Sequence, residues 1–95
     1  MGVDVVRRVV KLVNREGLHA RPACKIVTTA NQFDADVVIA IDDLQADGKS
    51  IMEVMMLASP LGTEVGIEAR GPDAEKVADA ICELIQEGFG EELAP

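Results

Sequence analysis

The fold is set by residues 5–30, which read VVRRVVKLVNREGLHARPACKIVTTA. Residues 5–13 are mostly β-branched, which predicts a strand. Residues 14–17 (NREG) supply turn chemistry. Apolar residues then recur at three- and four-residue spacing up to Phe33, which predicts a helix. Pro22 fits the first turn of that helix, because the first turn can spare an amide hydrogen.

Similar patterns continue through the rest of the chain. Alternating side chains predict three further strands, at residues 36–41, 44–47 and 63–70. Ser50 is a suitable N-cap for a short helix over residues 51–58. A last helix is expected after residues 71–73 (GPD), and it should stop at Gly88. Its apolar stripe consists of Val77, Ala78, Ile81, Leu84 and Ile85.

The predicted order is β-α-β-β-α-β-α within 95 residues and 10.1 kDa, which is enough for one small domain over residues 1–95. Short strands that alternate with helices in so small a chain favour one sheet with all helices on one face. This arrangement is an open-faced α+β sandwich. A ferredoxin-like arrangement is the nearest alternative, and the sequence leaves the strand order open.

Composition excludes several classes of partner. Seventeen acidic residues against nine basic ones give a net charge of -8, which repels nucleic acid and anionic membrane surfaces. The chain has no Trp and no Tyr, so it lacks aromatic platforms for stacking bases. The two cysteines, Cys24 and Cys82, are expected to pack as small apolar residues. Sparse cysteines without a secretory pattern favour a cytoplasmic location.

His19 is the only histidine, and it lies in GLHARPA (residues 17–23), between the first predicted strand and the first predicted helix. The opening amides of a helix, here those of Ala20 and Arg21, lack partners within the helix and stabilise an anion. A neutral imidazole nitrogen is a competent nucleophile near neutral pH. The guanidinium of Arg21 would stabilise a phosphoryl group, and Gly17 would let the backbone bend closely around the ring. The residues of a phosphohistidine site are therefore adjacent in sequence.

Other roles for His19 fit its sequence context less well. A histidine at a helix start is commonly a polar surface residue or one that bonds a nearby carbonyl. A metal site would lack a second histidine and cysteines at ligand spacing. A Ser-His-Asp site would lack the sharp turn that presents the serine. We therefore expect no metal and no cofactor.

Two motifs occur at a characteristic separation, namely GLHARPA at residues 17–23 and GKSIM at residues 48–52. They resemble the active-site and regulatory signatures of the histidine-containing phosphocarrier proteins, HPr, of the bacterial phosphotransferase system. Residues 33–37 (FDADV) and 71–73 (GPD) are also similar to the family, so the resemblance covers nearly the whole chain. The tail at residues 89–95 resembles the nitrogen-related branch of the family, NPr, whereas the GKS motif resembles the sugar branch.

The resemblance implies an HPr-type fold with a four-stranded, mainly antiparallel sheet and three helices on one face. It implies that enzyme I, phosphorylated by phosphoenolpyruvate, passes the phosphoryl group to His19, on the ring nitrogen nearer the main chain. Arg21 would stabilise that group, and an EIIA-type component would receive it for sugar uptake or its regulation. The chain would then be a transfer intermediate rather than a stand-alone enzyme. We expect a monomer, because a small carrier must visit several partners in turn.

Ser50 supports an alternative function. In some relatives the matching serine is phosphorylated by an HPr kinase/phosphorylase, so the resemblance implies a regulatory site at Ser50. The alternative is a binding module that the state of Ser50 controls, with little transfer through His19. A phosphate at a helix N-cap is electrostatically favourable there.

The helix predicted after Ser50 has more apolar residues than one side of a short helix can bury. Val54 and Leu57 are expected in the core. Methionine adapts to several partner surfaces, and the family uses this helix for docking. The candidate docking residues are Ile51, Met52 and Met55.

Overall fold

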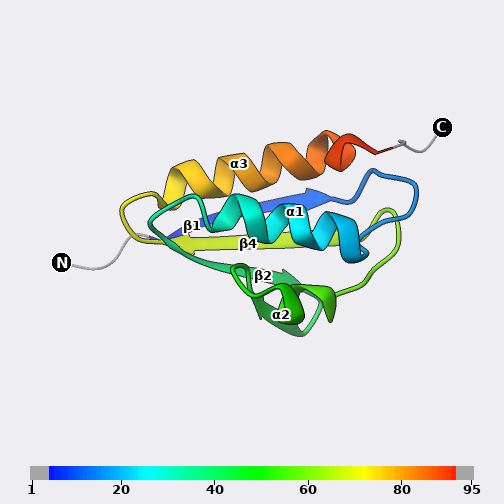
Figure 1. Ribbon diagram of the computed structural model, residues 1–95, viewed down its shortest axis with the longest axis horizontal. Coiled ribbons are helices and arrows are strands. Elements are labelled where there is room, and N and C mark those ends of the chain that lie inside the picture. The colour runs from blue at the N-terminus through cyan, green and yellow to red at the C-terminus, as the bar shows by residue number, and fades with distance from the viewer. Residues whose placement is uncertain (1–4, 92–95) are drawn as a thin grey trace.

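The computed structural model describes residues 5–91 as a four-stranded sheet with helices packed on one face (Figure 1). The strands are β1 (Val5–Lys11), β2 (Asp36–Ile41), β3 (Leu44–Asp47) and β4 (Glu64–Arg70). The helices are α1 (Ala20–Ala30), α2 (Ile51–Met55) and α3 (Ala74–Gln86), followed by a short 3-10 turn, η1 (Gly88–Gly90). The predicted α+β class and order of elements are confirmed.

The strand order, which the sequence left open, is β1-β4-β2-β3. All three pairings are antiparallel, with Val10 opposite Val65 and Ile39 opposite Ile67. The last strand of the chain is therefore central, between β1 and β2. Because β1 and β2 are both antiparallel to β4, they are parallel to each other, and α1 supplies the crossover that parallel strands require.

The core lies between the helices and one face of the sheet. β4 shows the expected alternation, because Val65, Ile67 and Ala69 are buried between more exposed neighbours. The predicted stripe of α3 is buried apart from Leu84, which is partly buried against the core. On the other face of the sheet, Val9 is exposed. The apolar patterns of β4 and α3 therefore predicted correctly which face of each element is buried.

Several elements end earlier or begin later than predicted. β1 ends at Lys11 rather than at residue 13, and β4 begins one residue late, at Glu64. α1 ends at Ala30, and Phe33 packs partly against the core from the turn that follows. α2 ends at Met55 rather than near residue 58. After Met55 the chain continues in a turn, in which the amide of Met56 donates to the carbonyl of Glu53 and the amide of Leu57 donates to the carbonyl of Val54.

A pair of backbone hydrogen bonds positions the segment before α1. The amide of Leu18 donates to the carbonyl of Ser59 at 2.8 Å, and the amide of Ser59 donates to the carbonyl of Leu18 at 3.2 Å. Gly17 has a φ of +69°, and a Cβ added there would lie 2.2 Å from the Ser59 carbonyl oxygen. The close approach therefore requires glycine, and it brings the turn before α1 against the loop after α2.

None of the helices within residues 5–91 is long and apolar enough to cross a membrane.

Candidate functional site

His19 is the N-cap residue of α1, as the sequence predicted. Its backbone is extended, and its side chain is 35% exposed. The amides of Ala20 and Arg21 have no hydrogen-bond partner among the described residues, and Pro22 has no amide hydrogen. The imidazole therefore lies at the open, electropositive end of an eleven-residue helix.

An open pocket of about 840 Å³ lies over this end of α1. It is lined by Arg15, Glu16, His19, Ala20, Arg21, Lys25, Gly90 and Glu91. Three cationic side chains thus face two carboxylates, although the chain as a whole carries a net charge of -8. Cations therefore outnumber acids around the imidazole in this pocket, and such a site favours a phosphoryl dianion.

Arg21 lies on the wall of this pocket with its side chain exposed. Its guanidinium makes no hydrogen bond or ion pair with any residue between 5 and 91, so its donors are available to a ligand. The structure therefore brings together His19, Ala20 and Arg21, as the sequence predicted. Ser50, Ile51, Met52 and Met55 lie outside the pocket.

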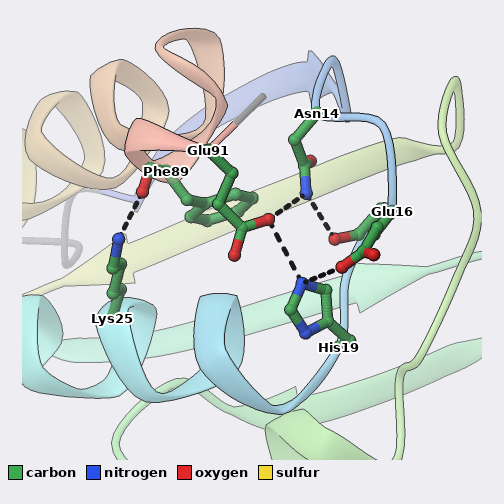
Figure 2. A network of polar contacts seen from close by, with 7 residues as sticks. Asn14, Glu16, His19, Lys25, Phe89 and Glu91 are labelled. Carbon is green, nitrogen blue, oxygen red and sulfur yellow. Dashed lines mark hydrogen bonds and ion pairs between the residues drawn. The ribbon is translucent and has the colours of Figure 1, made fainter. Parts of the chain in front are cut away.

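Sequence reasoning missed two carboxylates beside His19. Oε1 of Glu91 lies 3.1 Å from Nε2 of His19, and Oε2 of Glu16 lies 3.6 Å from the same nitrogen. Figure 2 shows both carboxylates on one side of the ring and the other nitrogen, Nδ1, pointing away from them. The Glu91 side chain is only 16% exposed. Nε2 of the imidazole is thus engaged, whereas Nδ1 makes no hydrogen bond or ion pair with any residue between 5 and 91.

Asn14, predicted only as a turn residue, is fully buried. Its carbonyl accepts the turn hydrogen bond from the amide of Gly17 at 3.1 Å. Its side-chain Nδ2 donates to the carbonyl of Gly17 at 2.7 Å and to Oε1 of Glu91 at 3.0 Å (Figure 2). The buried amide therefore links the turn before α1 to the segment after α3.

The pKa of Glu91 reflects these contacts. Burial on its own raises the pKa of the carboxyl, because it disfavours the charged form. Hydrogen bonds from His19 and Asn14, with electrostatic attraction to His19 and Lys25, outweigh burial and lower the pKa below its ordinary value. Glu91 is therefore an ionised acceptor at neutral pH.

The stability that Glu91 contributes should decrease in acid. Because its pKa is lowered in the folded state, this stability is complete above the ordinary value of 4.5 and is lost as the pH falls through the lower folded-state value. Urea unfolding of the wild type and of Glu91→Gln from about pH 6 to about pH 3 should show their difference in unfolding free energy shrinking. Glu87→Gln, at an exposed neighbouring position, is the control. A difference for Glu91→Gln that stays constant with pH contradicts the assignment.

Glu16, His19 and Glu91 are also the group within residues 5–91 whose donor atoms could share a metal ion, since these atoms lie within 4.8 Å of one another. The direct hydrogen bond between His19 and Glu91 accounts for their closeness without an ion. A cation at Nε2 would have to displace the proton that this bond requires. The absence of a metal stays a prediction.

Ser50 caps α2 as predicted. Its hydroxyl accepts a hydrogen bond from the amide of Glu53 at 3.3 Å. The Glu53 carboxylate accepts from the amide of Asp47 at 3.0 Å, so an acidic side chain is fixed close to the cap. The structure gives Ser50 a helix-capping role, and its regulatory role stays a prediction.

The surface of α2 exposes methionines, and Val54 and Leu57 are buried as expected. Met52 is 78% exposed, and Met55 is also exposed. Ile51 is half-buried and packs against the core, so it contributes only part of its side chain to this surface. Met56, which was not among the docking candidates, is as exposed as Met52.

The two cysteines differ. Cys82 packs partly against the core, close to its expected place on the buried face of the last helix. The expectation that Cys24 packs as a small apolar residue was wrong, because it is exposed on α1. The buried side of that helix is instead taken by Pro22, Ala23, Ile26 and Ala30.

Comparison with known proteins identifies the family. A family model for PTS-HPr, described as "PTS HPr component phosphorylation site", matches residues 6–87. The chain belongs to the HPr family. It is therefore an HPr-type phosphocarrier protein of the phosphotransferase system. The GLHARPA segment lies within the matched region, with His19 at the pocket described above.

Relatives from both branches of the HPr family match almost the whole chain. The phosphocarrier protein HPr of Treponema pallidum is 40% identical over 93% of this chain and its own full length. The phosphocarrier protein NPr of Escherichia coli K12 is 35% identical over 92% of this chain and 98% of its own. A crystal structure of HPr from Thermoanaerobacter tengcongensis superimposes with a TM-score of 0.86 at 38% identity, covering 93% of this chain and 99% of that one. The HPr-type fold is thus confirmed.

Proposed function

We propose that the chain accepts a phosphoryl group from enzyme I on His19 and passes it to an EIIA-type acceptor, as a transfer intermediate rather than a stand-alone enzyme. The observation that carries the proposal is the place of His19, the sole histidine, at the mouth of a cation-lined pocket and at the free end of α1. This is also the residue that the family's active-site motif supplies. Phosphoenolpyruvate is the ultimate donor in this scheme.

The proposed step uses Nδ1 of His19 as the nucleophile. Its lone pair forms a bond to phosphorus, while the bond between phosphorus and the donor breaks and the donor keeps the electron pair. The unpartnered amides of Ala20 and Arg21 and the exposed Arg21 guanidinium then face the new dianion. The pocket is open to solvent, so the group stays accessible to the next acceptor. A carrier needs both properties, because a phosphoryl group that is held too firmly cannot be passed on.

We propose that partners bind the exposed methionines of α2 beside the site. Met52 and Met55 offer flexible apolar contacts, with the exposed part of Ile51 at the edge. The same surface serves enzyme I and the EIIA-type acceptor. We further propose that the protein acts as a cytoplasmic monomer and as one domain over residues 1–95. A dimer has been crystallised for the Thermoanaerobacter tengcongensis HPr, so the oligomeric state is a point for measurement.

The test of the carrier function is transfer from enzyme I. The purified protein is incubated with enzyme I and phosphoenolpyruvate, and intact-mass spectrometry should show one added phosphoryl group that is lost in acid and stable in base. Peptide mapping should place the group on His19. Subsequent addition of an EIIA-type protein should remove it. A wild-type chain that stays unlabelled by enzymes I that phosphorylate other HPr proteins contradicts the proposal.

The alternative, a binding module controlled by Ser50, rests on the same helix cap and predicts a different product. An HPr kinase/phosphorylase with ATP would add an acid-stable phosphate to Ser50. That phosphate would lie at the cap on the Glu53 amide, which favours it, and next to the fixed Glu53 carboxylate, which repels it. An acid-stable phosphate on Ser50, with no phosphate on His19, favours the function as a binding module controlled by Ser50.

A further inference from the structure

Glu91 reaches His19 from a turn that the structure holds in place. α3 ends at Gln86, and the backbone of Phe89 in η1 has a φ of 59° while its ring is 1% exposed. Positive φ is rare for a bulky residue and persists only where the surroundings impose it. Here the ring is buried in the core, and Nζ of Lys25 donates a hydrogen bond to the Phe89 carbonyl (Figure 2). These contacts fix the chain just before Glu91.

Asn14 then fixes the carboxylate. The two hydrogens on Nδ2 are both used, one on the Gly17 carbonyl and one on Oε1 of Glu91. Both partners are pure acceptors, so the amide can only be oriented with its nitrogen toward them. The side chain is fully buried, where losing these partners would be costly. Oε1 of Glu91 is thus held beside the imidazole before any substrate arrives.

This arrangement determines which nitrogen of His19 carries the proton. An ionised carboxylate only accepts hydrogen bonds, so Nε2, at 3.1 Å from Oε1, must be the donor. In the neutral ring the proton is then on Nε2 and the lone pair is on Nδ1. The carboxylate of Glu16, 3.6 Å from Nε2, adds negative charge on the same side. Nε2 is therefore both protonated and shielded from a phosphoryl dianion.

We infer that Glu91, held by Asn14, is a positioning residue that directs phosphorylation to Nδ1 of His19. The inference rests on the proposed function and adds a residue to it. When Nδ1 bonds to phosphorus, the proton stays on Nε2 and the ring becomes cationic. Oε1 of Glu91 then faces that positive charge across the same hydrogen bond, so no proton has to move during transfer.

The experiment reads the ring directly and needs no partner protein. Protein labelled with ¹⁵N at histidine is studied by long-range ¹H–¹⁵N NMR at a pH where the ring is neutral, with a chelator present so that no metal competes for Nε2. The same samples are then phosphorylated with phosphoramidate, a small phosphoryl donor. The ¹⁵N shifts report the tautomer before the reaction and the phosphorylated nitrogen after it.

In the wild type we expect the Nε2–H tautomer and phosphate on Nδ1. Glu91→Ala should shift the tautomer ratio toward Nδ1–H by about tenfold or more, as expected for a lost charge-assisted hydrogen bond, and phosphate should appear on Nε2. Glu91→Gln keeps an oxygen acceptor and should restore the wild-type pattern. Glu87→Ala, exposed and close in sequence, is the matched control and should behave as the wild type.

Two results would overturn the inference. One is a wild-type ring with its proton on Nδ1, which can be read even if Glu91→Ala fails to fold. The other is a folded Glu91→Ala with the wild-type tautomer and phosphate on Nδ1 alone. Failure of the carrier function is a separate result, namely no transfer from enzyme I to the wild type. The ring measurements do not depend on that transfer, so the two failures are distinguishable.

Discussion

Under the proposed function, replacing His19 with alanine should abolish the acid-labile phosphate that enzyme I and phosphoenolpyruvate would add to the protein. The chain has no other histidine, so no second imidazole can replace it as the acceptor. The free amides at the start of α1 and the Arg21 guanidinium remain in the variant, but they stabilise a phosphoryl group only after a nucleophile has accepted it. Intact-mass spectrometry after the labelling reaction measures the effect.

A second substitution separates lost chemistry from lost structure. His19→Gln removes the nucleophile but keeps a side-chain N–H that can donate to Oε1 of Glu91. It should melt close to the wild type and still take up no acid-labile phosphate. Acid-labile label on a well-folded His19→Gln protein would show that another residue is the acceptor.

Gly17→Ala should cause a large loss of stability. Two unfavourable effects add at this position. The φ of +69° is strained for any residue with a Cβ, and the new Cβ would clash with the backbone, at 2.2 Å from the Ser59 carbonyl oxygen and within 3 Å of Pro60. The neighbours are main-chain atoms and cannot rotate away. We expect a loss of about 2–4 kcal/mol in the free energy of unfolding. Urea unfolding and a melting temperature lower by roughly 10–20 °C would show it.

Gly62→Ala is the matched control for Gly17→Ala. Its φ is +89°, but a Cβ there would meet nothing within 4 Å, so only the backbone cost applies. The expected loss is about 1–2 kcal/mol, and the difference between the two variants measures the contact with Ser59 and Pro60. Equal losses would show that the close approach contributes nothing.

Local patterns predicted most of the fold. The alternation of Val65, Ile67 and Ala69 and the stripe of α3 depend on neighbours in sequence, and both were confirmed. The strand order was not predictable, because the central place of β4 depends on pairings between residues far apart in the sequence, such as Val10 with Val65. The ends of α1 and α2 were overestimated, because the apolar pattern continues into the turns after these helices, where Phe33 and Leu57 also pack against the core.

The site was predicted only in part. His19, Ala20 and Arg21 are contiguous, so their meeting at the start of α1 followed from the motif. Glu91 and Asn14 are 77 residues apart and meet only through the fold. A signal was present nevertheless, because Phe89 stands between two glycines just after the helix stop. A large apolar residue in that setting indicates a segment that turns back onto the core.

The paired hydrogen bonds between Leu18 and Ser59 have a consequence for timing. These bonds join the backbone next to the His19 side chain to the loop that follows α2, so the position of one segment constrains the other. A partner that bound the exposed methionines of α2 would therefore meet the His19 imidazole at a fixed distance and orientation. If enzyme I and the acceptor share this surface, as proposed, the donor must dissociate before the acceptor can bind. Under that proposal, the rate of phosphoryl carriage would be limited by how quickly each complex dissociates.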